Sequence, residues 1–292
     1  MPVPLVETAP AKINLTLRVL ARRVDGYHEI SSLVVFADCG DRLTLTPGGD
    51  LALTVHGPSA AQAGQSADNL VLKAARALAE RFPDIVLGRF ELEKNLPVAA
   101  GIGGGSADAA AALRLLARAN DLSLREPGVF AAARATGADV PVCLEPRPRL
   151  MSGIGEKLSE PLAVPPLHAV LVNPGVALAT KDVFTGWMPA AELGDSFDVA
   201  AVAKTDYAGF LQLVAAQPND LEPSAVKLAP VIGDVLAAVR ALADCRLARM
   251  SGSGATCFGL FDASAGARHA AVALSSKYPQ WWVHACVLGD AG

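Results

Sequence analysis

Alternating apolar and polar residues mark one short strand in the first half of the chain, and a helical pattern follows it. From Phe90 to Glu93 every second residue is a glutamate, which predicts a half-exposed strand over residues 89–94. Good helix formers then run from Ala107 to Leu116 and predict a helix. A loop with four glycines joins the two segments. The pattern therefore predicts a strand, a glycine-rich loop and a helix N-terminus in direct succession.

The same two periodicities recur along the rest of the chain. Alternation predicts a strand at residues 13–17, and apolar runs predict strands at 168–172 and 281–287. Two or three short strands are expected across residues 33–53, with turns at Asp41 and at residues 47–50. Further helices are expected at residues 69–82, 127–135, 179–184, 231–242 and 265–277, and a hairpin at 151–156. Strands and helices are thus mixed, and a proline-rich passage at 161–166 predicts two domains, 1–160 and 161–292.

The glycine loop has the features of a phosphate-binding turn. Gly101, Gly103, Gly104 and Gly105 can adopt positive φ, and Ser106 is expected to cap the helix, whose free N–H groups and dipole favour phosphate oxygens. No Gly-Lys-Ser/Thr ends the loop, so it is not the usual P-loop. Two alternatives stay open. One is a dinucleotide fingerprint with Asp121 downstream, although its strand would be uniformly apolar; the other is a plain structural turn.

Composition and charge exclude several classes of protein. The chain has 292 residues, a net charge of −4 and 18% charged residues, which gives no basic footprint for nucleic acid or an anionic membrane. No apolar run is long enough to span a bilayer, and no signal peptide is evident. The five scattered cysteines fit reduced thiols in the cytoplasm, and no His or Cys spacing predicts a protein metal site.

The glycine loop resembles the central motif of the GHMP kinases. In residues 97–106, PVAAGIGGGS, Ile102 replaces the usual leucine and a Gly-Gly-Ser ending replaces the serine-rich one. Three further blocks, around Lys12, Asp139 and Ser253, resemble the family in the same order along the chain. The resemblance implies an α+β, two-domain GHMP kinase fold, with a ribosomal-S5-like N-terminal half and a ferredoxin-like C-terminal half.

The resemblance also implies a reaction. Within the family, the chain is most similar to members that use ATP to phosphorylate the 2-hydroxyl of a methylerythritol carrying a cytidine diphosphate, in the non-mevalonate isoprenoid pathway. Lys12 and Asp139 match the catalytic pair, in which the aspartate accepts the substrate's proton and the lysine stabilises or activates the hydroxyl. Mg²⁺ is expected as part of the nucleotide complex, with Asp108 or the Ser106 hydroxyl as possible helpers.

The family pattern supplies the remaining site residues, position by position. For ATP they are Asn69, Lys94, Leu96, Pro97, Val98, Ala99, Ala100, Gly101, Ile102, Gly103, Gly104, Gly105, Ser106 and Ala107. For the substrate they are Asn14, Tyr27, His28, Thr180, Phe184, Gly252 and Ser253. The rings of Tyr27 and Phe184 would sandwich the cytosine, with the His28 segment at its edge. From the residues alone, Tyr27 and His28 would belong to an Asp-Gly turn and Phe184 to the core.

Two other functions remain open. A GHMP kinase for homoserine or mevalonate would have no base to stack on Tyr27 and Phe184. A non-catalytic binding module of the same fold would have no use for Lys12 and Asp139. The expected partners are small molecules, without nucleic acid or membrane, and the expected state is a monomer or weak homodimer.

Overall fold

The computed structural model describes residues 3–63, 68–189 and 196–292, and the chain divides into two compact units. Unit 1 comprises Met1–Ala11, Cys39–Val98 and Gly103–Pro146. Unit 2 comprises Lys12–Asp38, Ala99–Ile102 and Arg147–Gly292. The chain passes between the units within β1 (Leu5–Asn14), within β3 (His28–Pro47), on either side of residues 99–102 and after Pro146.

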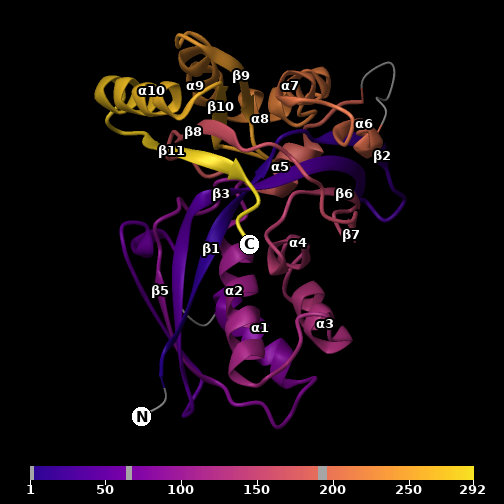
Figure 1. The fold of residues 1–292 in the computed structure, drawn as a ribbon, viewed down its shortest axis with the longest axis vertical. Helices are drawn as coiled ribbons and strands as arrows, with labels where there is room; N and C mark the ends of the chain where they lie inside the picture. The colour runs from indigo at the N-terminus through magenta and orange to yellow at the C-terminus, as the bar shows by residue number, and fades with distance from the viewer. Residues whose placement is uncertain (1–2, 64–67, 190–195) are drawn as a thin grey trace. The chain divides into compact units, whose positions relative to one another are not determined.

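Unit 1 combines a small sheet with a cluster of helices (Figure 1). Its strand β5 (Gly88–Glu93) runs antiparallel to the second half of β3, from Arg42↔Glu93 to Pro47↔Gly88, and parallel to β4 (Ala52–His56). The alanine-rich helix α2 (Gly104–Ala119) is buried along most of its length. Three helices contact it directly, namely α1 (Leu70–Ala79), α3 (Pro127–Thr136) and α4 (Val140–Leu144), whereas the short η1 (Ala60–Gln62) lies beside β4. Small alanine side chains let these helices approach α2 closely.

Unit 2 contains an antiparallel sheet covered by two helices (Figure 1). Strand β8 (Leu167–Asn173) pairs with β10 (Cys257–Phe261) and β11 (Trp282–Gly289), and β9 (Cys245–Met250) pairs with β10. Helices α9 (Val231–Arg240) and α10 (Ser264–Lys277) pack on these strands through apolar side chains. The remaining elements are β2 (Arg18–Arg22), β6 (Arg149–Gly153), β7 (Lys157–Leu158), α5 (Thr180–Thr185), α6 (Val199–Val202), α7 (Tyr207–Ala216) and α8 (Glu222–Leu228).

Most predicted elements are confirmed, with boundaries shifted by a few residues. The strand at 89–94 is β5, the hairpin at 151–156 is formed by β6 and β7, and Asn69 caps α1 by accepting from the Val71 N–H. The predicted turn at Asp41 is wrong, because β3 continues through this residue. Tertiary partners explain the failure: the Asp41 carboxylate is fully buried and accepts several hydrogen bonds, so it has no need of the local turn geometry that aspartate favours. The weakly patterned stretch from residue 190 lies partly outside the described residues.

The helix cap expected at Ser106 is also wrong, as is the cap that threonine would be expected to form at Thr180 in the helix predicted at 179–184. Helix α2 begins at Gly104 with Gly103 as its N-cap, so Gly104, Gly105 and Ser106 lie within the first turn. Gly103 has a φ of 63°, a conformation that glycine adopts without steric cost. Helix α5 has Ala179 as its N-cap, and the Thr180 hydroxyl instead lies 3.0 Å from that of Ser253.

Two chain-wide features complete the fold. All five cysteines are free thiols. Among the residues that the structure describes, no helix is both long enough and apolar enough to cross a membrane. The domain boundary at residue 160 stays a prediction, because the two compact units divide the chain in another way.

Candidate active site

Every second residue of the glycine loop from Ala99 to Gly103 has a positive φ. Ala99, Gly101 and Gly103 have φ values of 52°, 73° and 63°, whereas Ala100 and Ile102 between them do not have positive φ. Residues with positive φ are a component of the concave backbone nests that bind anions. The loop geometry therefore supports a phosphate site, as the sequence predicts.

Hydrogen bonds within unit 2 hold the carbonyl side of this loop. The Ala100 carbonyl accepts from the Thr256 N–H at 3.0 Å, and the Ile102 carbonyl accepts from the Lys12 N–H at 2.9 Å. The Gly101 carbonyl accepts from the Ser251 hydroxyl at 3.2 Å. In a trans peptide the C=O and N–H groups point in opposite directions. The N–H groups of the following residues are therefore turned away from these partners.

Gly101 is fixed by a close approach of two backbone segments. A Cβ at this position would lie 2.5 Å from the Gly254 carbonyl oxygen and 2.7 Å from that of Ser251, and the φ of Gly101 is already 73°. Neither contact involves a flexible side chain that could move aside. Gly101 is thus the position where the loop requires glycine most clearly.

The first turn of α2 supplies further unpaired donors. The first hydrogen bond of the helix runs from the Ala107 N–H to the Gly103 carbonyl at 2.8 Å. The N–H groups of Gly104, Gly105 and Ser106 therefore have no acceptor within the helix. Their position at the positive end of the helix dipole favours phosphate oxygens.

A buried charge cluster lies against this helix start within unit 1. The Lys94 ammonium lies 2.5 Å from Asp41 Oδ2 and 2.6 Å from Asp108 Oδ2, and all three residues are almost fully buried. The other Asp41 oxygen, Oδ1, accepts the N–H groups of Asn95 and Leu96. A Cβ on Gly104 would lie 3.3 Å from the Lys94 ammonium, so this glycine faces the cluster. The Lys94 ammonium is thus already paired with two carboxylates, and its contact with ATP stays a prediction.

Burial controls the protonation of this cluster. Desolvation raises the pKa of Asp108 to about 8 against the attraction of Lys94, and the neighbouring carboxylate of Asp41 acts in the same direction as burial. Burial lowers the pKa of Lys94, but the charges of Asp108 and Asp41 outweigh it, so the pKa is raised overall. At neutral pH the cluster therefore contains a charged lysine and a protonated Asp108.

Four of the residues predicted to bind the substrate lie in or beside a second glycine loop, residues 251–254. The Asn14 N–H donates to Ser251 Oγ at 3.1 Å, and a Cβ on Gly252 would lie 3.2 Å from Asn14 Oδ1. The Thr180 and Ser253 hydroxyls are in hydrogen-bond contact. The structure thus brings together Asn14, Gly252, Ser253 and Thr180, as expected for one site.

The aromatic residues form a cluster that differs from the predicted sandwich. The rings of His28 and Phe184 are stacked with centroids 5.0 Å apart, and Trp187 meets His28 edge-on at 5.5 Å. Phe184 is half-buried and also packs on the apolar core, whereas Tyr27 is 60% exposed. Burial and the charge of Arg22 lower the pKa of His28, so its ring is neutral at pH 7. His28 therefore covers one face of the Phe184 ring, and the stacking of this ring on the cytosine stays a prediction.

Several residues that organise the site were not predicted from the sequence. The Asn219 amide donates to the carbonyls of Met250 and Gly252, each at 2.8 Å, and so supports the second glycine loop. The buried Arg249 donates to three backbone carbonyls, those of Leu15, Val214 and Ala215, and burial lowers its pKa to about 10. The Asn-Asp-Leu-Glu-Pro segment at 219–223 was the only sequence signal that pointed to any of them.

The proposed catalytic residues lie in different units. Lys12 is 4% exposed near the end of β1 in unit 2, and Asp139 is the half-buried residue before α4 in unit 1. Each has interactions of its own. Their pairing stays a prediction.

The described residues offer no ready protein site for Mg²⁺. No group of three or more His, Cys, Asp or Glu side chains within them could hold a metal ion. Asp108 does not fit the helper role, because it is buried on Lys94 and holds a proton at neutral pH.

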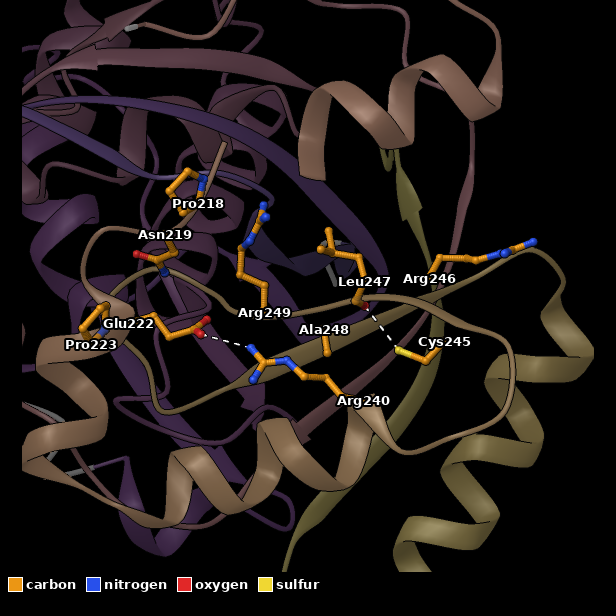
Figure 2. A pocket seen from close by; sticks show the side chains of 10 residues that line it. All are labelled: Pro218, Asn219, Glu222, Pro223, Arg240, Cys245, Arg246, Leu247, Ala248 and Arg249. Carbon is orange, nitrogen blue, oxygen red and sulfur yellow. Dashed lines mark hydrogen bonds and ion pairs between the residues drawn. The ribbon is translucent and has the colours of Figure 1, made fainter. Parts of the chain in front are cut away.

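A separate pocket of about 500 Å³ opens on unit 2 beside β9 (Figure 2). It is rich in arginine, but its charges are already engaged. Arg240 pairs with Glu222 at 3.3 Å, Arg246 pairs with Asp262, and the Arg249 guanidinium binds backbone carbonyls. This pocket is not the candidate active site, because none of the predicted site residues lines it.

Comparisons with known proteins match both halves of the chain. The model of the GHMP kinases N terminal domain matches residues 69–145, and that of the GHMP kinases C terminal matches residues 198–280. The 4-diphosphocytidyl-2-C-methyl-D-erythritol kinase of Rhodopseudomonas palustris is 59% identical over 288 residues, which is 96% of each chain.

Solved structures give the same result for the fold. A crystal structure of 4-(cytidine 5'-diphospho)-2C-methyl-D-erythritol kinase is 36% identical with a TM-score of 0.81, covering 98% of this chain and 100% of the other. A homoserine kinase from Cytophaga hutchinsonii has a TM-score of 0.74 at 21% identity, covering 99% and 96% of the two chains. The second likeness concerns the fold alone.

Proposed function

This chain belongs to the GHMP kinase family, and on that premise we propose that it phosphorylates 4-diphosphocytidyl-2-C-methyl-D-erythritol. The γ-phosphate of ATP would pass to the 2-hydroxyl of this alcohol, a step of the non-mevalonate isoprenoid pathway. One observation carries the substrate: a relative of that name shares 59% of its residues over 96% of the chain. The homoserine and mevalonate alternatives rest on likenesses of 21% and 17% identity, which concern the fold alone.

The triphosphate would bind to the donors of the glycine loop and the first turn of α2. Three of these donors are the N–H groups of residues 101–103, whose peptide carbonyls already accept hydrogen bonds from unit 2. The other three are the N–H groups of residues 104–106 in the first turn of α2. Backbone donors of this kind are fixed before the nucleotide arrives, so they cost little reorganisation. Asn69 and residues 94–98 would lie on the adenine side.

Lys12 and Asp139 would act on the alcohol. Asp139 accepts the proton of the 2-hydroxyl. The hydroxyl oxygen of the substrate then attacks the γ-phosphorus of ATP, and the bond between that phosphorus and the bridging oxygen, which leaves with ADP, breaks. The Lys12 ammonium balances the charge that forms on the attacking oxygen. Phosphoryl transfer needs mainly such positioning and charge stabilisation. Mg²⁺ would enter with ATP and neutralise phosphate charge.

The cytidine part would be recognised by the aromatic cluster of His28, Phe184 and Tyr27, with Thr180 and Ser253 beside it.

Free thiols at all five cysteines are compatible with a reducing cytoplasm. We expect a monomer or a weak homodimer.

An ATP-consumption screen tests this function directly. The purified chain is offered the cytidine-bearing methylerythritol, free methylerythritol phosphate, homoserine and mevalonate, each with ATP and Mg²⁺. We expect phosphorylation of the cytidine compound alone. Faster turnover of homoserine or mevalonate would contradict the proposed substrate and leave only the family assignment.

A further inference from the structure

A chain of hydrogen bonds in unit 2 fixes how the Asn14 side chain faces the second glycine loop. The Asn14 amide nitrogen donates to Ser32 Oγ at 2.7 Å. The Ser32 hydroxyl donates to the Thr16 carbonyl at 2.6 Å. Asn14 and Ser32 are 3% and 0% exposed, so water does not compete for these bonds.

The direction of this chain follows from which groups can donate. A backbone carbonyl only accepts, so the single hydroxyl proton of Ser32 is committed to Thr16. The Ser32 oxygen can then only accept from Asn14, and the Asn14 group that faces it must be the NH₂. The Asn14 carbonyl oxygen is therefore turned toward the opposite side.

That oxygen is left without a partner. Asn14 Oδ1 is buried and has no hydrogen-bond donor among the described residues. It lies next to the empty side-chain position of Gly252, where a Cβ would be 3.2 Å from Oδ1 and 2.8 Å from the Gly101 carbonyl oxygen. A buried acceptor without a donor is unfavourable, which indicates that a donor arrives with a ligand.

We propose that Ser32 is a positioning residue, which holds Asn14 so that its carbonyl oxygen accepts a hydrogen bond from a hydroxyl of the alcohol substrate. The inference rests on the proposed kinase function and deepens it. The substrate group that faces Asn14 Oδ1 would be a hydrogen-bond donor. Ser32, which does not touch the substrate, would make Asn14 selective for that donor by fixing the orientation of its amide.

A double-mutant cycle tests the proposal with a readout that a structural role would not give. The variants are Asn14→Ala, Ser32→Ala and the pair, assayed with whichever alcohol the wild-type chain phosphorylates best. We expect each single variant to lower kcat/KM for the alcohol by roughly 10- to 100-fold, with the KM for ATP unchanged. In the Asn14→Ala background, Ser32→Ala should cause no further loss, because its effect passes through Asn14.

Two further variants keep the test interpretable. Ser31→Ala removes a neighbouring hydroxyl that is equally buried but contacts Ser196 and the Phe197 N–H, and it should leave kcat/KM unchanged. Ser32→Cys nearly preserves the volume while weakening the acceptor, so it should lose activity even if the alanine variant fails to fold.

Separate outcomes would contradict the two proposals. Additive losses in the cycle, or wild-type activity in the Ser32→Ala and Ser32→Cys variants, would overturn the positioning role while leaving the kinase function intact. A preference for homoserine or mevalonate would overturn the proposed substrate, and the cycle would still be measured with that alcohol. Failure to phosphorylate any alcohol would overturn both.

Discussion

The Lys94 ammonium lies 2.6 Å from the Asp108 carboxyl group, and both residues are almost fully buried in unit 1. A second carboxylate, Asp41, shares the same ammonium. Two acidic groups thus face one cation, and burial resolves the imbalance by keeping a proton on Asp108. The cluster ties the end of β5 to α2, and Gly104 at the helix start packs against it.

The two aspartates should respond differently to the same substitution. Asp108 uses only Oδ2, and its Oδ1 has no partner, so Asp108→Asn can keep an oxygen on Lys94. Asp41 uses both oxygens as acceptors, so Asp41→Asn places an NH₂ group against Lys94 or against the N–H groups of Asn95 and Leu96. We expect Asp41→Asn to lower the free energy of unfolding by about 1–3 kcal/mol more than Asp108→Asn at pH 6. Urea unfolding checks this, and equal losses would contradict it.

The raised pKa of Asp108 also predicts a pH dependence of stability. The folded state holds this proton up to about pH 8, whereas an unfolded aspartate releases it near pH 4. Since the folded state binds more protons in this range, stability should fall as pH rises from about 4 to 8 and then level off. Asp108→Asn removes that component. Unfolding curves at pH 6 and pH 9 should therefore converge more closely for the variant than for the wild type, and parallel changes would contradict the assignment.

Local pattern was sufficient for most elements but not for this cluster. The alternation of Phe90 and Leu92 and the helix formers after Ala107 depend on near neighbours, so they were visible in the sequence. Asp41, Lys94 and Asp108 come together only in the tertiary structure, across 53 and 14 residues of chain. A turn at Asp41 was the natural expectation for an isolated aspartate, and burial overrode it.

The role of Asp139 can be tested with an isosteric change. Asp139→Asn keeps the shape of the side chain and removes the proton acceptor, so kcat should fall by roughly 10²–10⁴-fold with the KM for ATP little changed. Asp121→Asn is the matched control. Asp121 is exposed with a φ of 54°, which asparagine also adopts readily, and activity should be unchanged. Turnover near the wild-type rate in Asp139→Asn would exclude it as the base. Loss of ATP affinity in Asp121→Asn would favour the dinucleotide-type alternative.

Gly101 tests the phosphate loop more sharply than any other glycine. In Gly101→Ala the new Cβ meets the backbone of Gly254 and Ser251 at 2.5–2.7 Å in a left-handed conformation, so the loop must shift. We expect ATP affinity to fall more than 10-fold in a protein that still folds, measured by titration calorimetry. Gly233→Ala in α9 serves as the control. Its Cβ would make an ordinary contact of 3.5 Å with Val226, so stability should rise by up to about 1 kcal/mol without loss of affinity. Normal ATP binding by Gly101→Ala would move the triphosphate elsewhere.

The site was predicted best where a motif is contiguous in the chain. Residues 97–106 alone predicted a glycine-rich loop before a helix, and Gly101 and Gly103 do have the positive φ that glycine allows. The residues that support this loop could not be predicted from the sequence. Ser251 and Thr256 bind the loop itself, and Asn219 binds the second glycine loop, in each case across more than 30 residues of chain. The orientation of Asn14 likewise depends on Ser32, whose hydroxyl has no distinctive sequence context.

Phe184 is the last test, because it separates a stacking role from a core role. Its ring packs partly on the apolar core and is also stacked on His28. A cytosine would stack on the flat Phe184 ring, and base–aromatic stacking is worth about 1–3 kcal/mol. Phe184→Leu retains most of the apolar volume but not the flat face. We expect it to raise the KM for the cytidine substrate by about 5- to 100-fold, with the KM for ATP unchanged.

The control for this prediction is Phe210→Leu, the same substitution at a phenylalanine that is 1% exposed in α7. It should lower the melting temperature without changing either KM, since Phe210 has no exposed face to offer a base. His28 provides an independent readout, because its ring is stacked on the Phe184 ring and would sense a base that binds there. The imidazole NMR signals of His28 should therefore shift on adding the cytidine compound and stay fixed on adding ATP. If Phe184→Leu weakens ATP and not the cytidine substrate, the two base pockets are assigned the wrong way round. If it behaves like Phe210→Leu, Phe184 is a core residue and the cytosine binds elsewhere.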